Sequence, residues 1–148
     1  MPCLPAGHIA RGLIDACILP AMMRFVLKVL SARFTVARLG ARDAIPPWAL
    51  AGGFYSITRT SNELSIVCES SRVPGGIRSE TGWRALEVRG PLAFEQVGIM
   101  AALTEVLAGR GISIFAVSTY DTDYILLKDA DLDAAKLALE AAGHSVVA

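Results

Sequence analysis

The chain has 148 residues, of which 53% are hydrophobic and 19% are charged, and its 14 basic residues balance 14 acidic ones. This length and composition suit one ordinary domain or two very small ones, and they exclude a disordered chain. Because the basic residues are scattered and the net charge is zero, the sequence lacks the electrostatic footprint of a nucleic-acid-binding protein.

The cysteines and histidines give no pattern of a metal site or a disulfide framework. Cys3, Cys17 and Cys68 are an odd set without a CxxC pair, and His8 and His144 lie at opposite ends of the sequence. We therefore expect no metal and no cofactor, and a reducing compartment, the cytoplasm.

The first residues are apolar but broken by polar ones. The stretch "GLIDACILPAMMRFVLKVL" contains Asp15, Pro20, Arg24 and Lys28, which makes it a poor membrane-spanning helix, and it lacks the layout of a secretory signal. We expect residues 1–23 to be an extension outside the core, with no membrane association.

The next segment, residues 24–80, predicts a small domain of strands. "ARFTVARL" alternates like a strand, and the two prolines of "DAIPPWAL" allow only a short helical turn. "GGFYSITRT" and "ELSIVCES" predict a hairpin, and "RVPGGIRSETG" predicts a loop.

The last segment, residues 81–148, switches between strand and helix periodicity. The expected elements are a strand at 83–90, a helix at 97–107, strands at 112–119 and 124–128, a helix at 131–143 and a strand at 144–147. This order is βαββαβ, the ferredoxin-like unit, so the predicted class is α+β, with antiparallel strands and helices on one face.

A weak internal repeat connects the two segments. Shifting the sequence by sixty residues places Ser56–Leu64 on Ala116–Tyr124, with hydroxyls, a polar turn and one carboxylate, Glu63 or Asp123, in both copies. Duplication is one explanation, and the general likeness of hairpins is the other.

The stretch "STYDTDY", residues 118–124, concentrates the polar chemistry of the second half. Asp121 and Asp123 resemble a metal-binding pair or a pair of acid-base carboxylates, but no phosphate loop and no His, Cys or Lys partner lies nearby. A plain polar turn is a third reading, although seven consecutive polar or aromatic positions exceed what a turn needs. We expect no enzyme activity.

A ligand-binding site is the interpretation that accounts for both the polar hairpin and the helix start of residues 81–148. "GPLAFEQVGI" leads from a strand into a helix, whose first N–H groups can bind a carboxylate. Gly98 costs stability in a first helical turn, which either a backbone approach to a ligand or tight packing on the sheet would explain. Asp123 can pair with an ammonium group, and Asp121 then serves the turn.

These residues resemble a known family. The βαββαβ unit with Gly98-Ile99 at its first helix is similar to an ACT domain, and "ISIFAVSTYDTDYILL" resembles the ACT modules of the CASTOR arginine sensors. "FYSITRTSNELSIVC" resembles the leading half of small bacterial tandem-ACT proteins, so residues 24–80 would be a degenerate, truncated ACT-like domain before the ACT domain at 81–148.

The resemblance implies a non-catalytic regulatory protein, a homodimer, that binds a free amino acid at a seam between ACT modules. The residues it assigns to the site are Gln96, Gly98, Ile99, Thr119, Tyr120, Thr122 and Asp123. The arginine sensors have acidic chemistry at the helix start, where this chain has Glu95 and Gln96. The alternative is a ligand-free ACT-type module that pairs its sheet with a partner enzyme or regulator.

Overall fold

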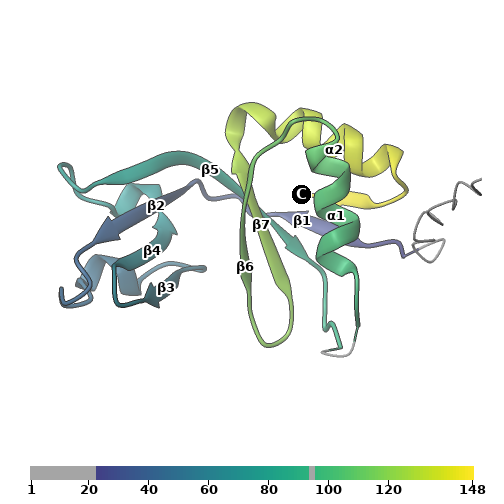
Figure 1. The fold of residues 1–148 in the computed structure, drawn as a ribbon. Coiled ribbons are helices and arrows are strands. Elements are labelled where there is room, and N and C mark those ends of the chain that lie inside the picture. Colours follow the sequence, from purple (N-terminus) through teal and green to yellow (C-terminus); the bar gives the residue numbers. More distant parts are fainter. Residues whose placement is uncertain (1–22, 94–95) are drawn as a thin grey trace, which may run out of the picture.

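The computed structural model describes residues 23–93 and 96–148. The predicted extension therefore lies almost entirely outside the described residues. The described elements (Figure 1) are strands β1 (Val26–Val29), β2 (Phe34–Leu39), β3 (Ser56–Arg59), β4 (Leu64–Glu69), β5 (Ser79–Val88), β6 (Ile114–Ser118), β7 (Asp123–Lys128) and β8 (Ser145–Val147), helices α1 (Ile99–Ala108) and α2 (Leu132–Ala141), and short 3-10 turns η1 (Pro47–Leu50), η2 (Ser70–Arg72) and η3 (Asp129–Asp131).

Strand β5 connects two halves of the structure because it is ten residues long and changes neighbours along its length. Its first residues pair with β2, with Ser79 opposite Ala37 and Trp83 opposite Phe34. Its last residues pair with β7 on one side and with β1 on the other. The eight described strands form one sheet, with the order β3-β4-β2-β5 in its first half and β6-β7-β5-β1-β8 in its second half (Figure 1).

The second half is the expected α+β unit with one insertion. Strand β1, which the sequence pattern groups with residues 24–80, lies in the second half of the sheet between β5 and β8, antiparallel to the former and parallel to the latter. Leu27 and Val29 of β1 are buried in the core beneath the helices, and this burial explains the placement.

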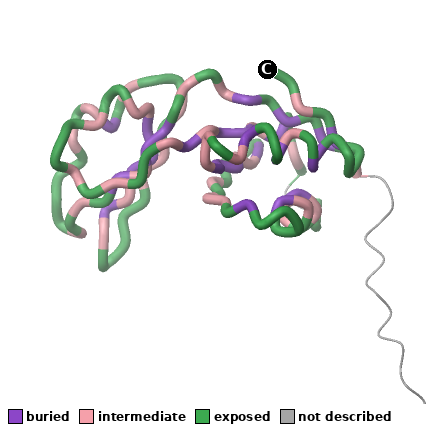
Figure 2. The backbone as a smooth tube through the Cα atoms, turned by 90° about the horizontal axis from the view of Figure 1, so that it is seen from above, coloured by how far each residue is buried: buried purple, intermediate pink, exposed green. Residues whose placement is uncertain are grey.

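Both helices lie on one face of the second half of the sheet, as predicted, and they bury its main core there (Figures 1 and 2). Leu103 and Leu107 of α1 and Leu139 of α2 are fully buried in this cluster. They recur at helical spacing, so one stripe of each helix faces the sheet.

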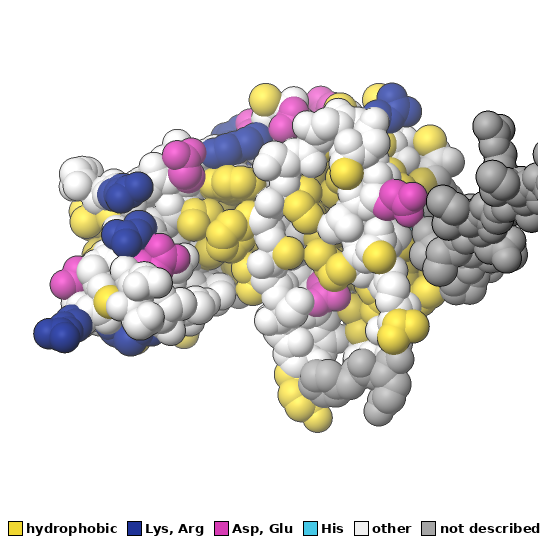
Figure 3. Space-filling view, viewed as in Figure 1, with side chains coloured by type: hydrophobic (Ala, Val, Ile, Leu, Met, Phe, Trp, Pro, Cys, Tyr) yellow, Lys and Arg dark blue, Asp and Glu magenta, His cyan; other side chains and the backbone are white. Residues whose placement is uncertain are grey.

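The opposite face of the second half of the sheet packs against the first half. Phe54 lies 4.5 Å from Tyr124 and 5.5 Å from Phe34 between ring centroids, and Trp83 lies 6.2 Å from Phe115. Hydrophobic side chains gather between the halves, beside β6, in the space-filling view (Figure 3). This contact provides the cover that the helix-free face of the sheet needs.

Two local predictions for the first half had different outcomes. The prolines do limit the helical structure to η1, a four-residue turn. The predicted loop at 72–82 is wrong at its end, because Ser79–Gly82 already belong to β5. The backbone N–H of Arg38 donates to the carbonyl of Arg78 at 2.9 Å, so pairing with β2 overrides the turn-rich local sequence.

The buried ring of His144 makes the stability of the fold dependent on pH. Its Nδ1 accepts the backbone N–H of Phe25 at 3.3 Å, its ring stacks on the Phe25 ring, and burial lowers the pKa of His144. A lowered folded pKa contributes stability above the unfolded value of about 6.5, and this contribution is lost as the pH falls through the folded pKa.

We therefore expect the free energy of unfolding to fall between about pH 7 and about pH 5, with a slope of at most about 1.4 kcal/mol per pH unit from this group. Urea unfolding across this range measures it. His144→Asn should flatten the slope, and an unchanged slope in this variant would assign the effect to other groups.

Candidate functional site

The turn between β6 and β7 is closed by Thr119. Its backbone N–H donates to the carbonyl of Thr122 at 2.8 Å, and its hydroxyl donates to the same carbonyl at 2.9 Å and accepts the Thr122 N–H at 3.2 Å. These bonds leave Tyr120 and Asp121 at the tip. Thr119 thus holds the turn, a role that the sequence interpretation gave to Asp121.

Thr122 anchors this turn to the end of β5. Its side chain is buried, with 8% of the residue exposed, and its hydroxyl donates to the carbonyl of Val88. The loop after β5 is tied to the same place, because the Leu92 N–H donates to the Asp121 carbonyl at 2.8 Å. The hydroxyls of Thr119 and Thr122 therefore both serve the hairpin, and a ligand would meet other atoms of these residues.

Helix α1 begins at a glycine in the left-handed conformation. Gly98 is the N-cap residue, with φ of 84° and ψ of 3°, and as a glycine it makes no side-chain capping hydrogen bond. A Cβ on Gly98 would meet no atom within 4 Å, so the tight-packing explanation is wrong and the positive φ accounts for the glycine. Within residues 23–93 and 96–148 no side chain caps the first N–H groups of α1, and these groups carry the positive end of the helix dipole.

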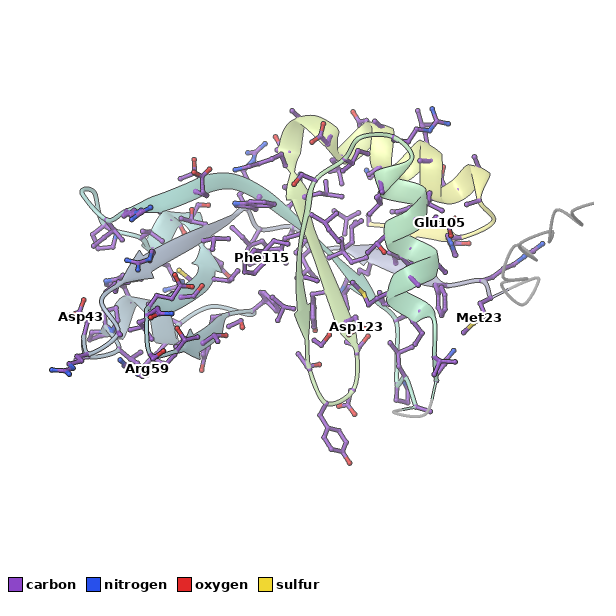
Figure 4. All side chains as sticks on the ribbon, in the orientation of Figure 1. Met23, Asp43, Arg59, Glu105, Phe115 and Asp123 are labelled. Atoms are coloured by element: carbon purple, nitrogen blue, oxygen red, sulfur yellow. The ribbon has the colours of Figure 1, made fainter. Side chains whose placement is uncertain are left out.

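Asp123 lies opposite this helix start. It is the first residue of β7, and one carboxylate oxygen, Oδ1, accepts the hydroxyl hydrogen of Ser118 at 2.5 Å. In Figure 4 it lies between the hairpin and the first turn of α1. Among the described residues no donor occupies Oδ2, so this oxygen is available to a cationic group.

A cavity of about 310 Å³ lies between the hairpin tip, the loop after β5 and the start of α1. All seven residues that the resemblance assigned to a site line it. The sequence interpretation did not include five further lining residues: Leu92, Ala93, Met100, Ser118 and Asp121. The volume is at the lower end of the range for small-ligand pockets.

The two ends of the cavity attract groups of opposite charge. Uncapped N–H groups attract an anion, and the Asp123 carboxylate attracts a cation. The described residues contain no group of three His, Cys, Asp or Glu side chains able to hold a metal ion. None of the described helices is long and apolar enough to span a membrane.

The first half has the same hairpin with different side chains. Thr60 donates its N–H to the Glu63 carbonyl at 2.9 Å, as Thr119 does to Thr122. The residue before each threonine then pairs with the residue after the turn, which gives Arg59 with Leu64 and Ser118 with Asp123. This strand pairing aligns Asp123 with Leu64, whereas the sixty-residue shift of the sequence aligned it with Glu63. The shift is therefore one residue too long.

Two family models match this chain. An ACT-domain model matches residues 78–141, and a model of an N-terminal domain matches residues 32–76. Human cytosolic arginine sensor for mTORC1 subunit 1 is 26% identical over 124 residues, which are 78% of this chain and 37% of that protein. The chain thus spans little more than a third of the curated relatives that it matches.

Two solved structures share the fold of this chain. The crystal structure of a protein from Agobacterium tumefaciens is 45% identical, with a TM-score of 0.80, and the match covers 84% of this chain and 92% of that one. Aspartate kinase from Clostridium acetobutylicum has a TM-score of 0.60 at 12% identity, with 78% of this chain and 34% of that chain covered, which is a likeness of fold.

Proposed function

Because this chain belongs to the ACT-domain family, we propose that it is a non-catalytic regulatory protein that binds a free amino acid in the cavity between α1 and the β6–β7 hairpin. The observation that carries the proposal is the pairing of the uncapped start of α1 with the Asp123 carboxylate across one small cavity. The human relative is named as an arginine sensor, and this supports the same class of function.

Each end of a free amino acid has a complementary group in this arrangement. The N–H groups at the start of α1, next to Gly98 and Ile99, receive the carboxylate. Asp123 receives the ammonium group at Oδ2 while Ser118 holds Oδ1 in place. Gln96, Thr119, Tyr120 and Thr122 complete the wall, so the ligand side chain determines how well it fills the cavity.

A thermal-shift screen of the twenty amino acids tests this function. An amino acid at one hundred times its Kd should stabilise the protein by about 2.7 kcal/mol, which is a clear rise in Tm. For the best ligand, the amide that lacks the carboxylate and the N-acetyl derivative that lacks the ammonium should each lose this effect. Failure of all twenty amino acids to raise the Tm would contradict the proposal.

The edge of β6 supports a homodimer that places this cavity at a seam between ACT modules. Because Thr119 and Thr122 are hydrogen bonded, the alternation of an antiparallel pair turns the N–H and C=O groups of Ile114, Ala116 and Ser118 away from β7. In the described chain β6 pairs with β7 alone. Its sequence, IFAVS, has no charge and no proline to discourage pairing.

Antiparallel pairing of two β6 edges about Ala116 would satisfy these groups and bring Ile114 of one copy beside Ser118 of the other. We expect Ala116→Lys to convert dimers to monomers in sedimentation equilibrium, because it places two like charges across the axis. Ala108→Lys, at an exposed alanine of α1, is the control and should remain dimeric. A monomeric natural protein, or an Ala116→Lys dimer, would exclude this interface.

The same edge favours the second candidate, a ligand-free module that pairs its sheet with a partner enzyme or regulator. The two functions differ in their dependence on Asp123, since Asp123→Asn would weaken ligand binding and leave sheet pairing intact. We place the protein in the cytoplasm, because the human relative is named as a cytosolic sensor.

A further inference from the structure

Arg59 takes a position in the first half that corresponds to the wall of the cavity in the second half. It pairs with Leu64 across the β3–β4 hairpin as Ser118 pairs with Asp123 across the β6–β7 hairpin. Leu64 is fully buried beneath η1, so Arg59, its cross-strand neighbour, lies on the same face of the sheet. This is the face on which the helices of the second half lie.

The Arg59 guanidinium spans the gap between this hairpin and the loop that follows β2. Nη2 donates to the carbonyl of Asp43 at 2.7 Å, and Nη1 donates to the carbonyl of Ala41. The loop is itself held in shape, because the Asp43 carboxylate accepts the Gly40 N–H at 2.7 Å. Arg59 and Asp43 lie at the same end of the first half in Figure 4.

The corresponding loop of the second half follows β5 and forms one wall of the cavity. There the loop is tied to the hairpin by backbone atoms, since the Leu92 N–H donates to the Asp121 carbonyl. In the first half the loop and the hairpin are joined by the Arg59 side chain itself, through the carbonyls of Ala41 and Asp43. Loop and hairpin thus meet in both halves, with open space in one and a guanidinium in the other.

We propose that the first half retains a counterpart of the cavity and that Arg59 of the same chain occupies it as a built-in guanidinium ligand. Two backbone carbonyls provide the acceptors that a planar guanidinium requires. The chain then has one open amino-acid site, in the second half, and a first half closed independently of any free ligand. Only this one-site stoichiometry rests on the proposed function.

Chemical rescue of Arg59→Ala by guanidinium ion tests the proposal directly. The variant leaves two carbonyls without their donors, so its Tm should fall by about 3 °C. Low-millimolar guanidinium chloride should recover at least half of this loss, whereas sodium or ammonium chloride at equal concentration should not. Arg42→Ala removes the same charge from the same loop, at an exposed side chain, and should show neither the loss nor the rescue.

Hydrogen exchange of residues 40–46 gives a second measurement. Exchange should speed up in Arg59→Ala and slow again with guanidinium. A variant as stable as the natural protein, or one that guanidinium does not rescue, would overturn the proposal. These results do not depend on whether any amino acid binds the second half, so failure here and failure of the proposed function can be told apart.

Discussion

Gly90→Ala is expected to destabilise the protein and to separate the loop after β5 from the hairpin. A Cβ at this position would lie 2.8 Å from the carbonyl oxygen of Asp121 and 3.2 Å from the backbone nitrogen of Leu92. Both contacts are with backbone, so relief requires the loop or the turn to move. The hydrogen bond between these two residues lies at the same point, and we expect a loss of about 1–3 kcal/mol in the free energy of unfolding.

Urea unfolding of Gly90→Ala beside Gly75→Ala measures this loss. A Cβ at Gly75 would meet no atom within 4 Å, so this control should be neutral or slightly stabilising. Because the displaced loop forms one wall of the cavity, Gly90→Ala should also weaken any amino-acid response. Equal stability of the two variants would show that the loop and the hairpin are not in contact as described.

Thr122→Val is expected to have an effect of similar size for a different reason. The substitution keeps the shape of the side chain but removes the hydroxyl that donates to the buried carbonyl of Val88. An unsatisfied buried carbonyl costs about 1–3 kcal/mol. Thr122→Ser keeps the donor and should lose less, as measured by urea unfolding of both variants. A larger loss in the serine variant would assign the role of Thr122 to its methyl group.

The local elements of the second half could be predicted because their periodicity agrees with their burial. Leu103 and Leu107 recur at helical spacing and do face the core. The elements that the sequence did not predict depend on pairing between strands that lie far apart in the sequence. Ser79–Gly82 lie in a strand although their local sequence favours a loop, and β1 enters a sheet made mainly by residues more than fifty positions away in the sequence.

The sequence could predict which residues line the cavity but not the hydrogen bonds and backbone angles of each. A hairpin and a helix start that face each other bring Asp123 and Gly98 to one cavity. The hydroxyl of Thr122 is buried against Val88, which lies 34 residues earlier, and no sequence spacing reveals that bond. The reason for Gly98 is likewise a backbone angle, φ of 84°, and only the structure gives its value.

Calorimetric titration of the natural protein and of Asp123→Asn tests the central claim most directly, with the amino acid that raises the Tm most. Asp133→Asn, at an exposed carboxylate of α2 outside the cavity, is the control. We predict one ligand per chain, at least about tenfold weaker binding by Asp123→Asn, in line with the loss of a charged hydrogen bond, and no change in the control. Equal affinity of Asp123→Asn and the natural protein would contradict the account.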